Sequence, residues 1–133
     1  MDDADAPLVL YVEDEPAVLD LGVTALEEGG FRVERAASAD DAIRALERHP
    51  AFRALVTDID LPGGADGWDV ARRARELLPE AAVIYTSGGS PHDWASKGVP
   101  GSIMLVKPFA MAQLVVAVST AMLRPQSDTP SNS

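Results

Sequence analysis

The chain has 133 residues, of which 47% are hydrophobic and 24% charged, and its formal net charge is −10. This length and composition indicate one soluble domain with a core of ordinary size. It contains no cysteine, which excludes disulfide and thiolate chemistry. A strongly acidic surface repels nucleic acid and anionic lipid, so we expect direct binding to neither. The acidic start of the chain does not resemble a signal peptide, and we expect a cytoplasmic protein.

Short apolar runs alternate with stretches of helical periodicity through the first half of the chain. Leu8–Val12 predicts a strand, and Pro16–Glu28 predicts a helix that begins at a proline and ends before a Gly-Gly pair. A second strand is predicted over residues 31–35. Ser38 is placed to cap a helix that runs to about residue 49.

The same alternation continues after a third predicted strand, over residues 54–57, and a Gly- and Pro-rich loop. The elements predicted after this loop are a helix over 68–78, a strand over 82–86, a short and weak helix over 91–97, a strand over 102–106 and a final helix over 110–123. We expect residues 7–123 to form one domain. Residues 1–6 are then a flexible N-terminus, and residues 124–133, rich in Pro and Ser, a disordered tail.

Five strands that are each followed by a helix predict a doubly wound α/β fold, (βα)5, with a five-stranded parallel sheet. Right-handed crossovers leave few topologies, and we expect the flavodoxin-like strand order 2-1-3-4-5. Ligands of such folds bind beyond the carboxyl ends of the strands. The polar residues at these ends are Glu13 and Asp14 after the first strand, Asp58 and Asp60 after the third, Ser87 after the fourth and Lys107 after the fifth.

The carboxylates among these residues predict a magnesium site. Crowded carboxylates repel one another and stay ionised only beside a compensating cation. Oxygen ligands with room for water are what Mg²⁺ prefers. We expect Asp14 and Asp58 to bind the ion directly, Glu13 to bind it directly or through water, and the backbone carbonyl of Asp60 to add an oxygen.

An aspartate that faces a metal ion and a lysine is suited to attack phosphorus. Asp58 is therefore the candidate nucleophile. Lys107 and the metal would offset the charge that develops on the phosphoryl oxygens, and Ser87 would donate a hydrogen bond to the transferred group.

The segments VLYVEDEP, LVTDIDLPGGADG, VIYTSG and LVKPF together resemble the response-regulator receiver family, over nearly the whole chain except its ends. The resemblance implies that Asp58 accepts a phosphoryl group from a histidine kinase or a phosphotransfer protein. It also implies that Glu13 and Asp14 help to hold Mg²⁺. Ser87 is then the switch hydroxyl, and Lys107, which precedes a proline in a cis peptide bond, pairs with the phosphoryl group.

The sequence departs from the family pattern at several positions. The loop after the phosphoacceptor position is one residue longer than the common form. Thr86 is a neighbouring candidate for the switch hydroxyl, but Ser87 is favoured because Gly88 fits the small residue that follows it. Met104 replaces the aromatic residue often found three positions before Lys107, so the form of the switch that depends on this residue is not expected here.

Two other functions are compatible with parts of the sequence. A pseudo-receiver would dock partners without phosphorylation, but the complete set of site residues argues against it. The Asp58-Ile59-Asp60 segment is similar to the DxD of haloacid-dehalogenase-type phosphatases. In those enzymes the pair follows the first strand, whereas here a whole β-α-β unit precedes it. We therefore expect a phosphoacceptor that catalyses its own phosphorylation and dephosphorylation, not an enzyme with a separate substrate.

The final predicted helix carries no charged residue over positions 111–123. A helix on one face of a sheet normally has a polar outer stripe. This neutral surface predicts an interface, either for a downstream protein target or for a homodimer; the alternative is a merely neutral, alanine-rich surface. We expect no output domain within the ten or so residues that follow this helix. The chain thus resembles a stand-alone receiver or a piece of a larger regulator, acting as a signal carrier or as a phosphate sink.

Overall fold

The computed structural model describes residues 5–48, 51–89 and 92–123, and five parallel strands form one sheet in the order β2-β1-β3-β4-β5. This is the predicted doubly wound fold, and the predicted strand order is confirmed. The elements are β1 (Leu8–Val12), α1 (Pro16–Glu28), β2 (Arg32–Ala36), α2 (Ala39–Arg48), β3 (Phe52–Asp58), α3 (Gly67–Leu77), β4 (Ala82–Ser87), α4 (Trp94–Lys97), β5 (Ile103–Val106) and α5 (Met111–Met122).

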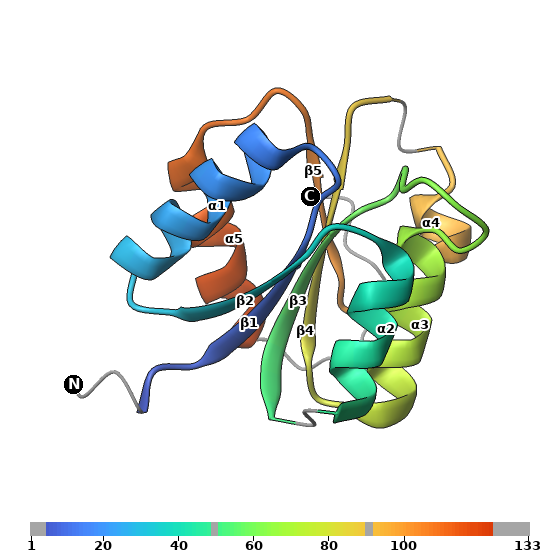
Figure 1. Ribbon diagram of the computed structural model, residues 1–133, viewed down its shortest axis with the longest axis horizontal. Coiled ribbons are helices and arrows are strands. Elements are labelled where there is room, and N and C mark those ends of the chain that lie inside the picture. The colour runs from blue at the N-terminus through green and yellow to red at the C-terminus, as the bar shows by residue number, and fades with distance from the viewer. Residues whose placement is uncertain (1–4, 49–50, 90–91, 124–133) are drawn as a thin grey trace.

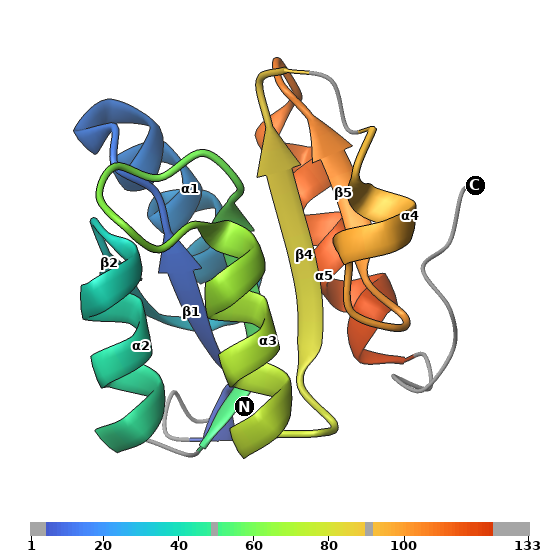
Figure 2. The same cartoon turned by 90° about the vertical axis from the view of Figure 1, so that its right-hand side faces the viewer.

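Helices cover both faces of the sheet (Figure 1). Helices α1 and α5 lie on one face, and α2, α3 and α4 lie on the other, where α2 and α3 pack side by side (Figure 2). Each face has its own hydrophobic cluster. We call them the α1/α5 cluster, which includes Tyr11, Val56 and Leu114, and the α2–α4 cluster, which includes Leu10, Trp68 and Tyr85. The sheet is therefore buried on both sides, which accounts for its nearly continuous apolar strands.

The structure shifts several predicted boundaries by a residue or two. Asp58 and Ser87 are the last residues of β3 and β4 and do not follow these strands. Both side chains are buried, so tertiary packing extends the strands beyond the apolar runs. The short helix before β5 is confirmed as a single turn, α4. The predicted start of that helix at residue 91, the end of α2 at residue 49, residues 1–4 of the expected flexible N-terminus and the expected disordered tail lie outside the described residues.

Local hydrogen bonds explain where the helices begin. The amide of Asp41 donates to Ser38 Oγ over 3.1 Å, as predicted for the start of α2. Helix α3 begins with a capping box, in which the Asp66 carboxylate accepts from the amide of Asp69 and the Asp69 carboxylate accepts from the amide of Asp66. Such a pair satisfies amide groups that the first helical turn leaves without partners.

The start of α3 is pressed against the end of β3. The amide of Gly67 donates to the carbonyl of Ile59 over 3.0 Å. A β-carbon added at Gly67 would lie 2.1 Å from the carbonyl oxygen of Asp58, so only glycine fits this approach. This contact fixes the position of the Asp58 backbone.

Candidate phosphorylation site

A lysine joins two carboxylates at the carboxyl end of the sheet. Lys107 Nζ donates to Asp58 Oδ2 over 2.9 Å and to Glu13 Oε1 over 2.9 Å. These side chains come from the ends of β3 and β1 and from the residue that follows β5. Asp58 and Glu13, which are 49 and 94 positions from Lys107 in sequence, are thus brought next to it, as the strand-end pattern predicts.

The two carboxylates of this group are almost wholly removed from water. Asp58 is 5% exposed and Glu13 is 1% exposed. Burial raises the pKa of Glu13, although its hydrogen bonds with Lys107 and with the amide of Glu15 act in the opposite direction. For Lys107, burial alone would lower the pKa, but the hydrogen bonds with Glu13 and Asp58 outweigh burial and raise it above the usual range of lysine. Lys107 therefore remains a cation at neutral pH.

The residues present fit a magnesium ion. Glu13, Asp14 and Asp58 each offer a carboxylate oxygen, and these oxygens lie within 4.8 Å of one another. One lysine cannot neutralise three carboxylates, so the group retains negative charge for a cation. The donors are all oxygens, and Asp14 is exposed, which leaves room for metal-bound water.

The backbone that follows Asp58 folds back toward the carboxylate of Asp58. The amide of Asp60 donates to Asp58 Oδ1 over 3.1 Å, so the two oxygens of Asp58 are held by different partners. The side chain of Asp60 is exposed and lines the neighbouring cavity. A metal contact through the backbone carbonyl of Asp60 stays a prediction.

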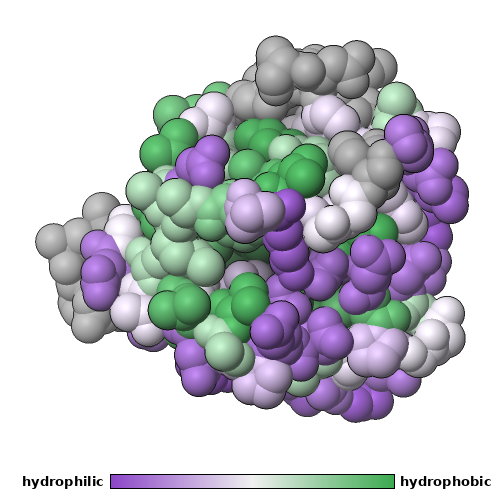
Figure 3. Space-filling view, turned by 90° about the horizontal axis from the view of Figure 1, so that it is seen from above, coloured by the Kyte–Doolittle hydropathy of each residue, from purple (hydrophilic) through white to green (hydrophobic). Residues whose placement is uncertain are grey.

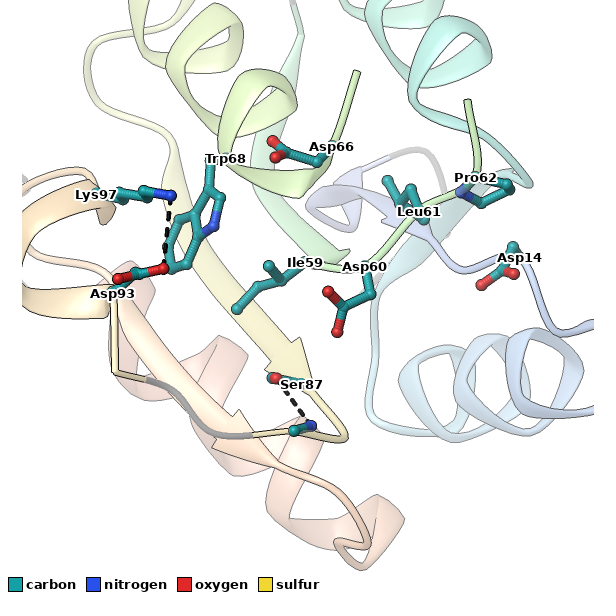
Figure 4. A pocket seen from close by; sticks show the side chains of 11 residues that line it. Asp14, Ile59, Asp60, Leu61, Pro62, Asp66, Trp68, Ser87, Asp93 and Lys97 are labelled. Carbon is teal, nitrogen blue, oxygen red and sulfur yellow. Dashed lines mark hydrogen bonds and ion pairs between the residues drawn. The ribbon is translucent and has the colours of Figure 1, made fainter. Parts of the chain in front are cut away.

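Ser87 faces a cavity of about 610 Å³ beside this group. Figure 4 shows Asp14, Asp60 and Ser87 around the same hollow, reached from the ends of three different strands. Ser87 Oγ accepts a hydrogen bond from the amide of Gly89 over 3.2 Å and keeps its own hydrogen for another acceptor. Thr86 is also buried, but its Oγ1 has no hydrogen-bond partner among the described residues, and it does not line the cavity. The role of Ser87 as the switch hydroxyl stays a prediction.

The far wall of this cavity was not predicted from the sequence. It is formed by Trp68 at the start of α3, by Asp93 just before α4 and by Lys97 at the end of α4. Asp93 and Lys97 are paired over 3.5 Å (Figure 4). Trp68 is 5% exposed and also packs in the α2–α4 cluster. Trp68 lies near the start of the helix that follows the Asp58 loop, and this position in the sequence could have predicted that it lines the cavity.

Comparisons with known proteins agree on one family. The family model of the response regulator receiver domain matches residues 9–119. A crystal structure of a response regulator receiver protein from Sinorhizobium medicae is 41% identical and superposes with a TM-score of 0.86, covering 90% of this chain and 96% of that chain. The chain therefore belongs to the response regulator receiver domain family, and it is a receiver domain of two-component signalling.

Curated relatives contain such a domain within longer proteins. The sensor kinase CckA of Brucella abortus is 34% identical over 114 residues, which are 83% of this chain and 12% of that protein. The transcriptional regulatory protein PrrA of Mycobacterium tuberculosis is 34% identical over 131 residues, which are 96% of this chain and 54% of that protein. The chain thus spans about half the length, or less, of these relatives. The Lys107-Pro108 peptide bond is cis, as the resemblance implies.

Proposed function

We propose that this receiver takes up a phosphoryl group on Asp58, in a reaction that depends on Mg²⁺, from a histidine kinase or a histidine phosphotransfer protein. The observation that carries the proposal is the contact of Lys107 Nζ with both Asp58 and Glu13 at 2.9 Å, beside the exposed carboxylate of Asp14. One nucleophile, one fixed cation and a set of metal ligands then share one end of the sheet.

The chemistry exchanges one bond to phosphorus for another. A carboxylate oxygen of Asp58 attacks the phosphorus of a phosphoimidazole, the P–O bond forms as the P–N bond breaks, and the imidazole nitrogen leaves with the electron pair. Lys107 offsets negative charge on the phosphoryl oxygens, and Ser87 donates a hydrogen bond to one of them. Glu13, Asp14, Asp58 and the carbonyl of Asp60 would hold Mg²⁺. When bound, the ion supplies positive charge that neutralises the phosphoryl oxygens.

The first experiment is to incubate the chain with acetyl phosphate or phosphoramidate, in Mg²⁺ or in EDTA, and to read its intact mass. We expect a single phosphoryl adduct that requires Mg²⁺ and is absent from Asp58→Asn. Asp60→Asn is the matched control, because it removes a neighbouring carboxylate that the proposal does not use, and it should still form the adduct. No adduct under any condition would favour the pseudo-receiver, and steady turnover of unrelated phosphoesters would favour the phosphatase.

The proposal includes a surface through which the phosphorylated chain acts on other proteins. Seen from above, hydrophobic surface gathers on the side where α1 and α5 lie (Figure 3). Leu105, Gln113, Val116 and Ala117 line a shallow hollow there, and Val116 is 62% exposed. A chain of net charge −10 repels its own copy, and uncharged α5 is where that repulsion is least.

We therefore include a homodimer through α5, or a downstream protein target on the same helix, in the proposed function. Light scattering with and without beryllofluoride tests the dimer, with Val116→Glu as the variant that should abolish it. A strict monomer in both states leaves the downstream target as the partner of this surface. Within the described residues, no helix is long and apolar enough to cross a bilayer. A cytoplasmic location is part of the proposal.

A further inference from the structure

The outer edge of β2 carries backbone groups that no strand covers. β2 lies at one edge of the sheet, and β1 is its only neighbour within the described residues (Figure 2). The amide of Arg32 donates to the carbonyl of Pro7 over 2.9 Å, on the β1 side. Because backbone groups of successive strand residues point to opposite edges, those of Glu34 also turn toward β1. Those of Val33 and Arg35 turn outward, and such an edge is a template for another strand.

The side chains of β2 divide between the two faces of the sheet. Val33 packs against the α1/α5 cluster, and Arg35 forms an ion pair with α1 over 2.7 Å. Glu34 faces α2, where its carboxylate lies 3.8 Å from Arg48, which is beyond hydrogen-bond distance. Arg32 is two residues before Glu34 and therefore faces the same side. The α2 side of this edge thus presents one cation and one anion, two positions apart.

A second copy of the chain fits this edge in one register. Two β2 strands that pair antiparallel are related by a twofold axis, which passes through one residue of β2 and keeps each face of the sheet on its own side. An axis through Arg32, Glu34 or Arg35 would place like charges opposite each other, which destabilises strand pairing. An axis through Ala36, the last residue of β2, would leave the rest of the strand unpaired. An axis through Val33 places valine opposite valine, and it sets each Arg32 opposite Glu34 of the other copy.

We propose that two copies of this chain pair through their β2 strands, antiparallel about Val33, into one continuous sheet. The outward amide of each Val33 donates to the carbonyl of the other. Each Arg32 forms an ion pair with Glu34 of the other copy. The guanidinium of Arg32 uses Nε for the carbonyl of Ala6 over 2.9 Å, which leaves its terminal nitrogens for this carboxylate.

The local charge permits this contact although the chain as a whole is acidic. A hollow beside β2 is lined by Arg35, Arg44 and Arg48 together with Glu34 and Asp41. Arginines thus offset the carboxylates at this edge. Two copies of a chain of net charge −10 therefore repel each other little when they meet through β2.

The pairing uses no residue of the phosphorylation site and goes beyond the proposed function. Antiparallel pairing directs the carboxyl ends of the two sheets in opposite directions, and the two sites point the same way as these ends. The dimer then presents two separate acceptors, and each leaves its own α5 uncovered. A partner that is itself paired or clustered gains avidity from such an arrangement without any new contact.

Sedimentation velocity of the full chain at rising concentration, without a phosphodonor, tests the pairing. All samples carry Val116→Glu, which removes the other proposed contact between copies, on α5. We expect a dimer. Arg32→Glu and Glu34→Arg should each weaken it at least about tenfold, because two facing pairs change from attraction to repulsion. Arg72→Glu and Glu80→Arg are the matched controls, since they make the same charge changes away from β2, and they should leave the dimer unchanged.

The two weakened variants should restore pairing when they are mixed. In the mixture, one strand presents two acidic side chains to two basic ones on the other strand. The double variant Arg32→Glu with Glu34→Arg restores the same pairs within one chain and should also form a dimer. Failure of both to associate would overturn the proposed register. A monomer at every concentration before any change in β2 would overturn the pairing itself, and the charges of β2 would then only protect an edge strand.

Amide exchange keeps the proposal testable if a variant does not fold. In a single copy the amide of Val33 faces outward, whereas in the dimer it is bonded to the other copy. We expect its exchange, measured by NMR, to slow as the concentration rises. The amide of Arg32 is bonded to Pro7 in both forms and is the internal control. Exchange at Val33 that is the same at all concentrations would overturn the pairing.

Discussion

Both faces of the sheet are buried, but they are held in different ways. On one face, Tyr11 packs among α1 and α5, and its hydroxyl has no hydrogen-bond partner within the described residues. On the other, Tyr85 packs among α2, α3 and α4, and its hydroxyl binds the amide of Val99. Nonpolar contact tolerates sliding and repacking, whereas a hydrogen bond is either made or broken. The second face is therefore the one suited to a two-state change.

The helices that cover the two faces differ in the same sense. Helix α5 carries no charged residue. Val116 of α5 and Leu21 of α1 are both more than half exposed. Helices α2 and α3 are joined at their surface by the ion pair of Arg73 with Glu47 over 3.0 Å. Exposed ion pairs contribute little to stability. A surface that carries them is also a poor site for an apolar partner. The surface of α5 is therefore better suited to an apolar partner than the surface of α2 and α3.

The largest expected effect comes from adding a methyl group on each face. At Gly67 the new group would meet the backbone carbonyl of Asp58 at 2.1 Å, which cannot move without displacing β3. At Gly22 it would meet Cε2 of Tyr11 at 1.9 Å, the far end of a side chain that makes no hydrogen bond with any described residue. We expect Gly67→Ala to lower the free energy of unfolding by about 3 kcal/mol and Gly22→Ala by about 1.5 kcal/mol. Urea denaturation measures both.

The control for this pair is Gly64→Ala, whose β-carbon would have no atom within 4 Å. It should unfold as the wild type does. Equal losses at Gly67 and Gly22 would show that the ring of Tyr11 is as immobile as backbone, and the distinction between the two faces would then be wrong.

A smaller effect is expected when the cation of the site is removed. Lys107→Met leaves the buried carboxylates of Glu13 and Asp58 without their shared partner. Breaking a fully buried pair costs about 3–5 kcal/mol, but the side chain of Lys107 is 25% exposed, so we expect about 2 kcal/mol in EDTA. Mg²⁺ should restore part of this loss in thermal denaturation. Lys97→Met, which breaks an exposed pair with Asp93, is the comparison and should change little. A Lys107 variant as stable as the wild type in EDTA would contradict the view that the carboxylates need this cation.

The two tyrosines give the next smaller difference. Tyr85→Phe leaves the buried amide of Val99 without its acceptor, and we expect a loss of about 1–2 kcal/mol in the free energy of unfolding. Tyr11→Phe removes a hydroxyl that has no hydrogen-bond partner in the described part of the chain, so it should be neutral or slightly stabilising. Urea denaturation of the two variants side by side checks the sign as well as the size. A Tyr11 variant that loses as much as the Tyr85 variant would mean that the hydroxyl of Tyr11 is bonded after all.

The sequence was sufficient for the fold and for the group at the strand ends. Apolar runs and turn residues are local signals, and the carboxyl ends of parallel strands meet at one edge whatever the details of packing. Glu13, Asp58 and Lys107 were therefore placed correctly relative to one another. The family resemblance added the choice of Ser87 over Thr86, which the cavity favours.

The remaining features depend on contacts between residues far apart in sequence. The bond from Val99 to Tyr85 spans 14 positions, and no local pattern announces it. The close contact of Tyr11 with Gly22 likewise depends on the distance between β1 and α1 in the folded chain, and hydrophobic periodicity does not predict that distance. The ends of β3 and β4 were placed one residue early because the buried polar side chains Asp58 and Ser87 do not continue an apolar run.

The smallest difference between the two faces is expected in the ionisation of their buried tyrosines. Burial raises the pKa of Tyr11 and of Tyr85 to about 12 from the ordinary value of 10.0, although the amide of Val99 lowers the pKa of Tyr85 somewhat. The folded chain then binds more protons than the unfolded chain between these values, so this contribution to stability is complete below about pH 10 and is lost as the pH rises toward about 12. Absorbance of tyrosinate measures the ionisation directly. At about pH 11 the native chain should show almost none, whereas the chain in urea should be mostly ionised. Titrating Tyr85→Phe and Tyr11→Phe separates the two groups. A tyrosine of the native chain that ionises near pH 10 would have its hydroxyl in contact with water. The face of the sheet that carries this tyrosine would then not be closed to solvent.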